Sequence, residues 1–252
     1  MSDELLDRIN EAELPEPLQA ALRGLAQALE PVLPTLPDHP QHMASRLFGR
    51  VLEEAADPAT ETHWWEANLD LAVKTVGNAG GAVGGLQQAA ARVAPLMHER
   101  MGPYEEVTLR EITEQTVWGI CMLSDTLTEP QKHYVAPNAI SLAQAHFSPY
   151  AWFRAIYAGP APVGFLMLYD NPEEPEYFLW RMMIAEPYHG RGYGRQAIER
   201  LVEYVKTRPG AKELLVSYHK GEKSPEGFYL RLGFEPTGDI VEGEHVARLA
   251  LD

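Results

Sequence analysis

The sequence is poor in cysteine, and Cys121 is the single one among its 252 residues. A lone cysteine excludes an internal disulfide and any metal cluster held by cysteines. Its neighbours Ile120, Met122 and Leu123 are apolar, which favours a small hydrophobic side chain over a catalytic nucleophile. We therefore expect neither a disulfide nor a bound metal.

Long hydrophobic runs are also missing. No window approaches the roughly 20 apolar residues that a helix needs to cross a bilayer. The first residues, Met1 to Glu4, are acidic, and no apolar core of a signal peptide follows them. We expect a cytoplasmic protein with no membrane segment.

Basic residues are outnumbered, with 21 Lys and Arg against 36 Asp and Glu, so that the net charge is −15. The first 106 residues carry −10 of this charge. Such a field repels phosphate backbones and favours cationic partners. We expect no nucleic-acid partner, although an acidic balance alone says little about a substrate.

The first hundred positions carry apolar residues at helical spacing. Prolines between positions 31 and 40 interrupt the pattern, because each removes a backbone donor. We predict an all-helical domain over residues 1–101, a candidate for forming a homodimer, for covering an acceptor site or for binding a partner. The stripes that predict its helices are Leu18, Leu22, Leu25 and Leu29, then residues 43–55, 65–76 and 86–101, with a candidate kink at Pro95.

Two features of this part invite a ligand-binding interpretation. The glycine-rich run 77–85 lacks the Lys-Ser/Thr ending of a phosphate loop, and no apolar strand precedes it. We interpret it as a flexible connection. Trp64 and Trp65 adjoin an apolar helical stripe, which favours core packing over ligand stacking.

The apolar pattern changes near residue 107. Runs rich in aromatic and β-branched residues predict strands, and Gly159-Pro160 and Asn171-Pro172 separate them as turn residues do. We predict a mixed α/β domain over residues 102–252. Its predicted strands are 107–112, 150–157, 163–169, 177–184, 213–218 and two after Phe234, and its predicted helices are 113–123, 138–146, 192–206 and 224–232.

The segment from Ile184 to Arg195 has the chemistry of an anion site. A predicted buried strand leads into a turn dense in glycine, and the turn opens an amphipathic helix. Glycines let a phosphate approach the backbone, and the first N–H groups of a helix lack intrahelical partners and lie at the positive end of its dipole. Arg191 and Arg195 can add charge-assisted contacts.

A dinucleotide-binding loop is the rival interpretation. It requires Gly-x-Gly-x-x-Gly spacing and an acidic residue about 20 positions further on, after a second parallel strand. Here the glycines are Gly190, Gly192 and Gly194, and the loop follows several strands that we expect to be antiparallel. Both facts count against a dinucleotide.

The same segment resembles the pyrophosphate-binding motif of the GNAT superfamily of N-acetyltransferases, Gln/Arg-x-x-Gly-x-Gly/Ala. His189 departs from the usual Gln or Arg, whereas Gly192 and Gly194 match. Downstream, Phe228-Tyr229-Leu230-Arg231-Leu232-Gly233-Phe234 resembles the family's Tyr-x-x-x-Gly-Phe segment. Glu222 stands where the family often has asparagine, so that contact is not carried over. The resemblance covers residues 107–252 and implies a mixed, mostly antiparallel sheet flanked by helices.

A finer resemblance is to the bacterial spermine/spermidine acetyltransferase branch. It rests on residues 135–145, 177–184 and 190–195. It implies transfer of the acetyl group of acetyl-CoA to a primary amine by direct attack in a ternary complex, the amine being a small polyamine. The open alternatives are another amine (a protein N-terminus, a lysine or an aminoglycoside) and an acyl-CoA sensor without catalysis.

The resemblance also implies roles for individual residues. Tyr229 protonates the departing thiolate, and a strand edge holds the pantetheine arm. The residues implied in binding acetyl-CoA are Met182, Met183, Ile184, His189, Gly190, Arg191, Gly192, Tyr193, Gly194 and Arg195.

The base that deprotonates the amine is not fixed by the resemblance. Carboxylates gather between two predicted strands, and they can attract a polyamine or form a solvated acidic loop. His219 follows a strand expected to border the site, and an ordered water is an equal alternative. The candidate substrate-binding residues are Glu173, Glu174, Glu176 and His219, with Asp170 beside them.

Overall fold

The computed structural model describes residues 2–102, 104 and 106–251. The chain divides into two compact units, Met1–Tyr104 and Glu105–Asp252, each described by itself. None of the helices in the described ranges is long and apolar enough to cross a membrane.

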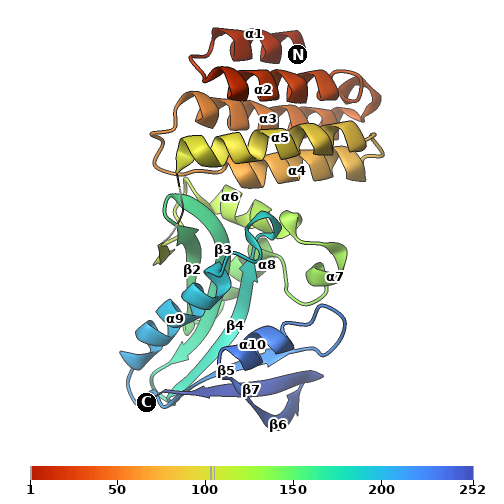
Figure 1. The fold of residues 1–252 in the computed structure, drawn as a ribbon. Helices are drawn as coiled ribbons and strands as arrows, with labels where there is room; N and C mark the ends of the chain where they lie inside the picture. The colour runs from red at the N-terminus through yellow and green to blue at the C-terminus, as the bar shows by residue number, and fades with distance from the viewer. Residues whose placement is uncertain (1, 103, 105, 252) are drawn as a thin grey trace. The chain divides into compact units, whose positions relative to one another are not determined.

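The N-terminal unit consists of helices (Figure 1). Contacts between helices pair α1 with α2, α2 with α5, α3 with α4, and α4 with α5. The predicted helical character of this part is confirmed, while α1 was not predicted. The helices are α1 (Ser2–Glu11), α2 (Glu16–Leu29), α3 (Asp38–Ala56), α4 (Trp65–Asn78) and α5 (Gly84–Met101), with a short 3₁₀ turn, η1, at Leu33–Thr35.

The core of this unit follows the apolar stripes. The four leucines of α2 are buried, and so is Trp65, at 0% exposure. The connection between α4 and α5 is shorter than the predicted glycine-rich run 77–85. Helix α4 includes Gly77, and α5 begins at Gly84. Pro95 lies inside α5, which remains one helix.

The C-terminal unit is built on a seven-stranded sheet of order β1-β2-β3-β4-β5-β7-β6. Every neighbouring pair is antiparallel except β4 with β5. The predicted mixed α/β fold is confirmed. The strands are β1 (Val107–Arg110), β2 (Ala151–Ala158), β3 (Ala161–Asn171), β4 (Glu176–Ile184), β5 (Glu213–Tyr218), β6 (Glu235–Val241) and β7 (Glu244–Ala250).

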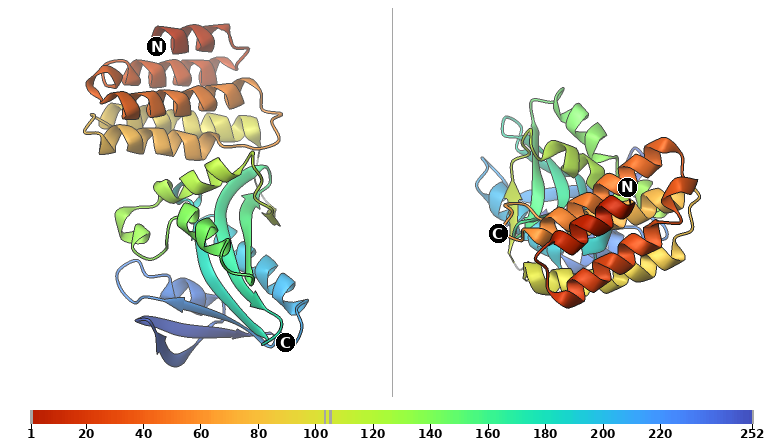
Figure 2. Two further views of the ribbon diagram at one scale, coloured as in Figure 1. Left: turned by 180° about the vertical axis from the view of Figure 1, so that it is seen from behind. Right: turned by 90° about the horizontal axis from the view of Figure 1, so that it is seen from above.

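Helices cover both faces of this sheet (Figures 1 and 2). Helices α6 and α8 pack on β3 and β2, and α9 packs on β1 and β4 from the opposite face. The helices are α6 (Val117–Met122), α7 (Glu129–Lys132), α8 (Asn138–Ala145), α9 (Tyr193–Lys206) and α10 (Glu226–Arg231), with 3₁₀ turns η2 (Leu123–Thr126) and η3 (Glu186–Tyr188).

Helix α6 begins later than predicted. Thr113 to Thr116 form a turn instead, in which the Thr113 N–H donates to Thr116 Oγ1 at 2.9 Å. Threonine side chains compete in this way with the backbone bonds of a helix. The predicted start at Thr113 was therefore four residues too early.

Strands β4 and β5 pair over only two positions, Phe178 with Leu215 and Leu179 with Val216. Just beyond them β4 has an irregular register against β3, with Met167 opposite Arg181 and Leu168 opposite Leu179, which leaves Trp180 as the extra residue of a bulge. A bulge bends and twists its strand. The end of β4, from Trp180 to Ile184, consequently separates from β5.

Candidate functional site

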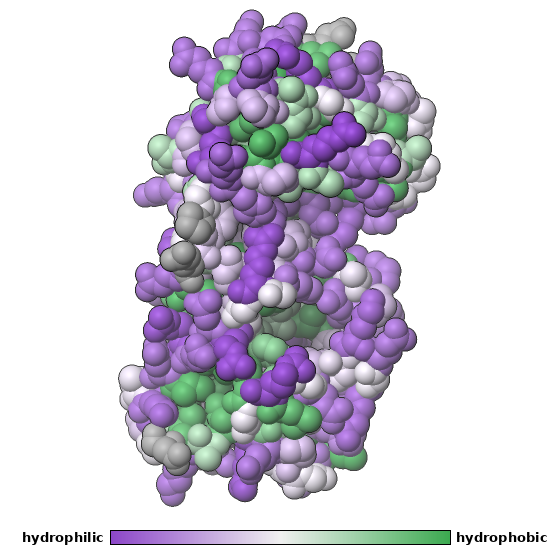
Figure 3. Space-filling view, in the orientation of Figure 1, coloured by the Kyte–Doolittle hydropathy of each residue, from purple (hydrophilic) through white to green (hydrophobic). Residues whose placement is uncertain are grey.

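Two adjoining recesses open where β4 and β5 separate. The loop recess, about 570 Å³, is lined by the end of β4, the turn 188–195 and α10. The strand recess, about 410 Å³, is lined by β4, the end of β5 and residues 131–136. In Figure 1 they lie where the end of β4, α7 and α10 meet, and Figure 3 shows a hollow on this face with apolar side chains inside it. Both recesses share Gln131, Met182, Met183, Ile184, His189, Lys223, Pro225 and Tyr229.

The turn that lines the loop recess needs glycine for two reasons. Gly190 and Gly192 have φ of +77° and +83°, and Gly192 caps the N-terminus of α9 in a left-handed conformation. A Cβ at either position would meet no atom within 4 Å. The backbone is therefore open to a ligand there, and Gly192, the N-cap of α9, has no side chain to satisfy the first N–H groups of the helix.

Gly194 serves a different purpose. A Cβ there would lie 3.3 Å from the ring of Phe228. The missing side chain lets the first turn of α9 pack closely against α10. Gly194 thus joins the two helices that border the loop recess, in addition to lining it.

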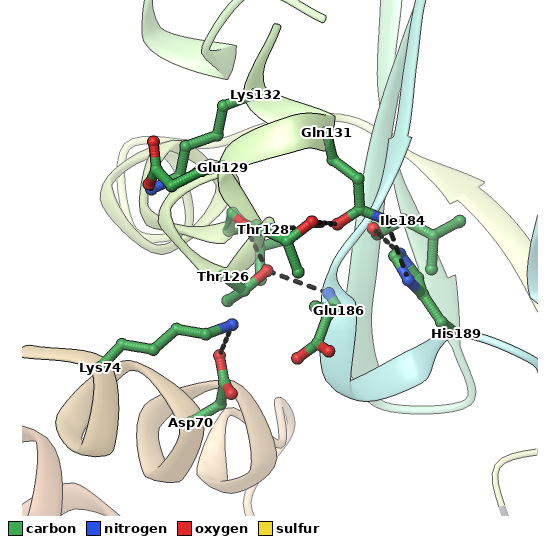
Figure 4. A network of polar contacts seen from close by, with 11 residues as sticks. Asp70, Lys74, Thr126, Thr128, Glu129, Gln131, Lys132, Ile184, Glu186 and His189 are labelled. Atoms are coloured by element: carbon green, nitrogen blue, oxygen red, sulfur yellow. Dashed lines mark hydrogen bonds and ion pairs between the residues drawn. The ribbon is translucent and has the colours of Figure 1, made fainter. Parts of the chain in front are cut away.

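His189 is held by a chain of hydrogen bonds (Figure 4). Gln131 Oε1 accepts from the Thr128 N–H and hydroxyl, both at 2.9 Å, which orients the Gln131 amide. The Gln131 amide nitrogen lies 3.5 Å from His189 Nδ1, and His189 Nε2 lies 2.7 Å from the Ile184 carbonyl oxygen. These partners fit a neutral imidazole with its proton on Nε2. His189 lines the loop recess as the motif implies, but its ring ties the turn to β4 and α7.

The two arginines of the turn are both exposed. Arg191 donates to the Pro187 carbonyl at 2.9 Å and lies over the Tyr188 ring, with its guanidinium carbon 5.4 Å from the ring centroid. Arg195 lines the loop recess, whereas Arg191 is not among its lining residues.

Tyr229 lies on α10 at the junction of the two recesses. Its ring packs among Phe228, Phe234 and Tyr218, with centroids 5.2 to 6.1 Å away. Burial raises the pKa of its phenol above the usual range, and the nearby negative charge of Glu244 raises it further. The hydroxyl consequently stays protonated at neutral pH and can act as a donor.

Glu244 is a candidate site residue that the sequence did not reveal. It begins β7 and lines the strand recess. Its carboxylate accepts a hydrogen bond from Ser217 Oγ and lies 3.4 Å from His219 Nε2. His219, a predicted candidate that follows β5, lines the same recess. The pairing of β5 with β7 brings Glu244 to the predicted site, and this pairing is not visible in local sequence.

Arg181 and Tyr218 also line the strand recess, and neither was predicted as a site residue from the sequence. Arg181 Nε and the Tyr218 hydroxyl are buried and have no hydrogen-bond partner among the described residues. Buried polar atoms without partners are uncommon, and a ligand bound in this recess would supply partners for both atoms.

The acidic residues predicted to attract the substrate lie elsewhere. Glu173, Glu174 and Glu176 are exposed around the turn from β3 to β4, at the end of β4 opposite the glycine turn, and neither recess includes them. Glu173 accepts from the Tyr150 hydroxyl at 2.9 Å. Asp170 is buried and bonded to Arg208 and Tyr204 at 2.9 and 2.7 Å.

Cys121 lies in α6 and lines neither recess. Burial raises the pKa of its thiol. A thiol that resists ionisation is a poor nucleophile, in keeping with the structural role predicted for it.

Residues 118–234 match the model of the acetyltransferase (GNAT) family. The resemblance derived from the sequence motifs is thereby confirmed over those residues. An uncharacterised N-acetyltransferase of Bacillus subtilis, YycN, is 31% identical over 81 residues, which are 31% of this chain and 51% of that protein. A 5-NmdU N-acetyltransferase of Pseudomonas phage PaMx11 is 29% identical over 84 residues, 33% of this chain and 57% of that protein. The chain thus spans about half the length of the curated relatives it matches.

Solved structures of acetyltransferases are similar to part of the chain. An acetyltransferase from Thermus thermophilus covers 57% of this chain and 97% of its own, at 21% identity and a TM-score of 0.46. A spermidine N-acetyltransferase from Vibrio cholerae, in complex with CoA and spermine, covers 57% and 95%, at 17% identity and a TM-score of 0.44. Both TM-scores lie below 0.5, so we base no argument about substrate on these two structures.

Proposed function

Because residues 118–234 carry an acetyltransferase (GNAT) family domain, we propose that the chain is an N-acetyltransferase that moves the acetyl group of acetyl-CoA to the primary amine of a small molecule. The observation that supports this most directly is the position of Tyr229 at the junction of the two recesses. One recess ends at a backbone anion site, and the other borders a carboxylate. A donor between them suits a reaction between two bound molecules.

The loop recess fits the diphosphate of acetyl-CoA. Gly190 and Gly192 leave their backbone open, and α9 directs the positive end of its dipole at the recess. Arg195 adds an exposed guanidinium. His189 contributes by fixing the turn, through its bond to the Ile184 carbonyl.

The end of β4 fits the pantetheine arm. Met182, Met183 and Ile184 line both recesses, and this stretch of β4 has separated from β5. An arm held along β4 would run from the glycine turn toward Tyr229. Its amides would find strand backbone, and its methylenes would find apolar side chains.

Bound acetyl-CoA supplies a thioester: the neutral amine nitrogen bonds to the acetyl carbon and then loses one proton, the bond from that carbon to sulfur breaks, and the sulfur takes up a proton. Tyr229 donates the hydrogen bond or proton to the sulfur, because its phenol stays protonated. Glu244 accepts the proton that the ammonium must lose before its nitrogen can attack, directly or through water. Ser217 and His219 hold that carboxylate in the strand recess.

The acceptor predicted from the sequence is a polyamine such as spermine or spermidine. The net charge of −15 and the resemblance to the polyamine branch support it. The predicted acidic residues Glu173, Glu174 and Glu176 lend no support, since they line neither recess. Polyamines therefore belong in the acceptor panel together with other small amines.

The test measures release of the free CoA thiol from acetyl-CoA with the full chain and a panel of primary amines. Calorimetric titration with acetyl-CoA runs beside it. We expect binding, and thiol release that requires an amine. Binding with no turnover on any amine would identify an acyl-CoA sensor instead, and absence of binding would refute the assignment of the loop recess.

A further inference from the structure

The strand recess carries more positive than negative charge. Lys132, Arg181 and Lys223 line it, while Glu244 is the one acidic residue among its lining residues in the described part of the chain. Lys132 is bound to Glu129 at 2.9 Å, so part of this charge is compensated. The contacts of Arg181 are to a backbone carbonyl and to a ring, and neither of these neutralises its charge.

Arg181 is set up to receive an anion. One guanidinium nitrogen, Nη1, donates to the Trp180 carbonyl at 2.7 Å, and the guanidinium carbon lies 5.5 Å from the centroid of the Trp180 ring. Its Nε is buried and has no hydrogen-bond partner in the described ranges of the chain. Burial lowers the pKa of this guanidinium, and the charge of Glu244 only partly opposes the shift. A half-buried arginine that makes no ion pair with a described carboxylate gains from an anion that enters its recess.

The opposite charge in the recess comes from β7. Ser217 and His219 hold Glu244 in place. The negative charge of Glu244 raises the pKa of both Arg181 and Tyr229. An ammonium group at Glu244 would therefore lie close to the donor that faces the sulfur. The recess thus presents one negative and one positive group to a single ligand.

From this arrangement we propose that the acceptor is an amine that also carries a carboxylate, that is, a small amino acid. Its ammonium group binds at Glu244 and its carboxylate at Arg181. The Tyr218 hydroxyl, buried and without a partner among the residues that the structure describes, is a further donor in this recess. The inference rests on the proposed acetyltransferase function and narrows its acceptor.

A polyamine fits this recess less well. It carries several positive charges and no negative one, so that only one of its nitrogens could pair with Glu244. The others would approach Arg181 and Lys223. Like charges brought together in a partly buried site repel each other.

The experiment compares matched acceptors on the full chain. Each amino acid is tested beside the amine that remains when its carboxyl group is removed, such as ornithine beside putrescine, with spermidine and spermine added. We expect the best amino acid to exceed its decarboxylated partner by about 10-fold or more in kcat/KM, as one charge-assisted pair predicts. A preference for the decarboxylated amines or the polyamines would overturn the inference while leaving the acetyltransferase function intact. Turnover of no amine would refute both.

Arg181→Met tests the residue itself. We expect it to lower kcat/KM for the amino acid by about 10- to 100-fold, mainly through KM, and to leave the decarboxylated amine within about twofold. Arg181→Lys should recover part of the loss, because it restores the charge without the planar fork. An equal loss on both acceptors would show that Arg181 is merely structural.

Arg154→Met is the matched control. Arg154 also donates from Nη1 to the preceding carbonyl, at 2.7 Å, and lies over a tryptophan ring, 4.6 Å from the centroid of Trp152. It lines neither recess. The ratio between amino acid and decarboxylated amine should stay unchanged in this variant.

Discussion

Tyr229 lines both recesses. Its buried ring is fixed by three aromatic neighbours, and its hydroxyl, protonated at neutral pH as phenols are, has its pKa raised further by burial and by Glu244. Tyr229→Phe keeps the ring and removes the donor. We expect kcat for CoA release to fall by about 100-fold, the lower range for loss of a general acid, with little change in the affinity for acetyl-CoA.

The control for this variant is Tyr150→Phe. Tyr150 bonds to Glu173 on the turn between β3 and β4 and lines neither recess. Its loss should leave kcat unchanged. A wild-type rate for Tyr229→Phe would rule out a donor role for that residue.

Glu244 provides a second test at the scale of a single residue. Glu244→Gln keeps the shape and the bond to Ser217 but removes the proton acceptor. We expect kcat/KM at pH 7 to fall by about 100-fold, and the loss to shrink toward pH 10, where aliphatic amines with a pKa of about 10 deprotonate without help. Rate profiles of both proteins from pH 6 to 10 measure this, with Glu235→Gln, on exposed β6, as control.

A loss that stayed constant across this pH range would mean that Glu244 only positions the acceptor. The proton would then leave by another route, such as His219 or water. The affinity for acetyl-CoA should be equal in wild type and Glu244→Gln in either case, because Glu244 does not line the loop recess.

At the scale of elements, the strands and helices of the C-terminal unit follow from local patterns. Strand β5 occupies the predicted residues, and α9 begins at Tyr193, one residue after the predicted start. The loop recess was predictable too, because its glycines and the N-terminus of α9 are contiguous in sequence. Such features depend on the spacing of apolar residues and on the residue types that favour turns, and both can be recognised within a few residues of sequence.

The strand recess could not be predicted in the same way. It exists because β4 runs parallel to β5 for two positions, bulges at Trp180 and then separates. Arg181 and Glu244 come to line the same recess through the sheet order β4-β5-β7, although more than sixty residues of chain separate them. The acidic turn 173–176 is a candidate substrate site in the sequence because it is dense in carboxylates. The density of acidic residues does not indicate which end of a strand faces the site.

The contact between α3 and α4 gives a prediction about pH. Glu54, buried on α3, accepts from the N–H groups of Trp64 and Trp65 at 2.8 and 2.9 Å and so caps α4. Burial raises the pKa of this carboxyl from 4.5 to about 7, although both backbone bonds oppose the shift. The folded unit therefore binds the proton more tightly than the unfolded chain does.

A raised carboxyl pKa stabilises the fold at low pH, and this contribution falls as pH rises from 4.5 to about 7. The loss is about 3 kcal/mol at most, from about 1.4 kcal/mol per pKa unit. We expect Glu54→Gln to flatten this dependence, as measured by chemical unfolding of the N-terminal unit at pH 5 and 7.5. Glu30→Gln, at an exposed position of the same unit, should behave as wild type. An unchanged dependence in Glu54→Gln would contradict the assignment.

At the scale of the whole molecule, the two units divide the chemistry unequally. Every residue that lines the loop recess or the strand recess belongs to the C-terminal unit. The helical unit carries −8 of the net charge of −15. If the recesses hold the reaction, the chemistry does not require the helices.

Removal of residues 1–104 tests this division. We expect the remaining chain to bind acetyl-CoA in calorimetry with unchanged affinity, and to release CoA on the best acceptor with kcat/KM within about threefold of the full chain, because the lining residues and their bonds are all retained. Circular dichroism checks that the shortened chain keeps its sheet, and its mass in solution is measured beside that of the full chain. Loss of turnover with intact binding would mean that the helical unit contributes to the acceptor side. A change in mass alone would assign that unit to self-association.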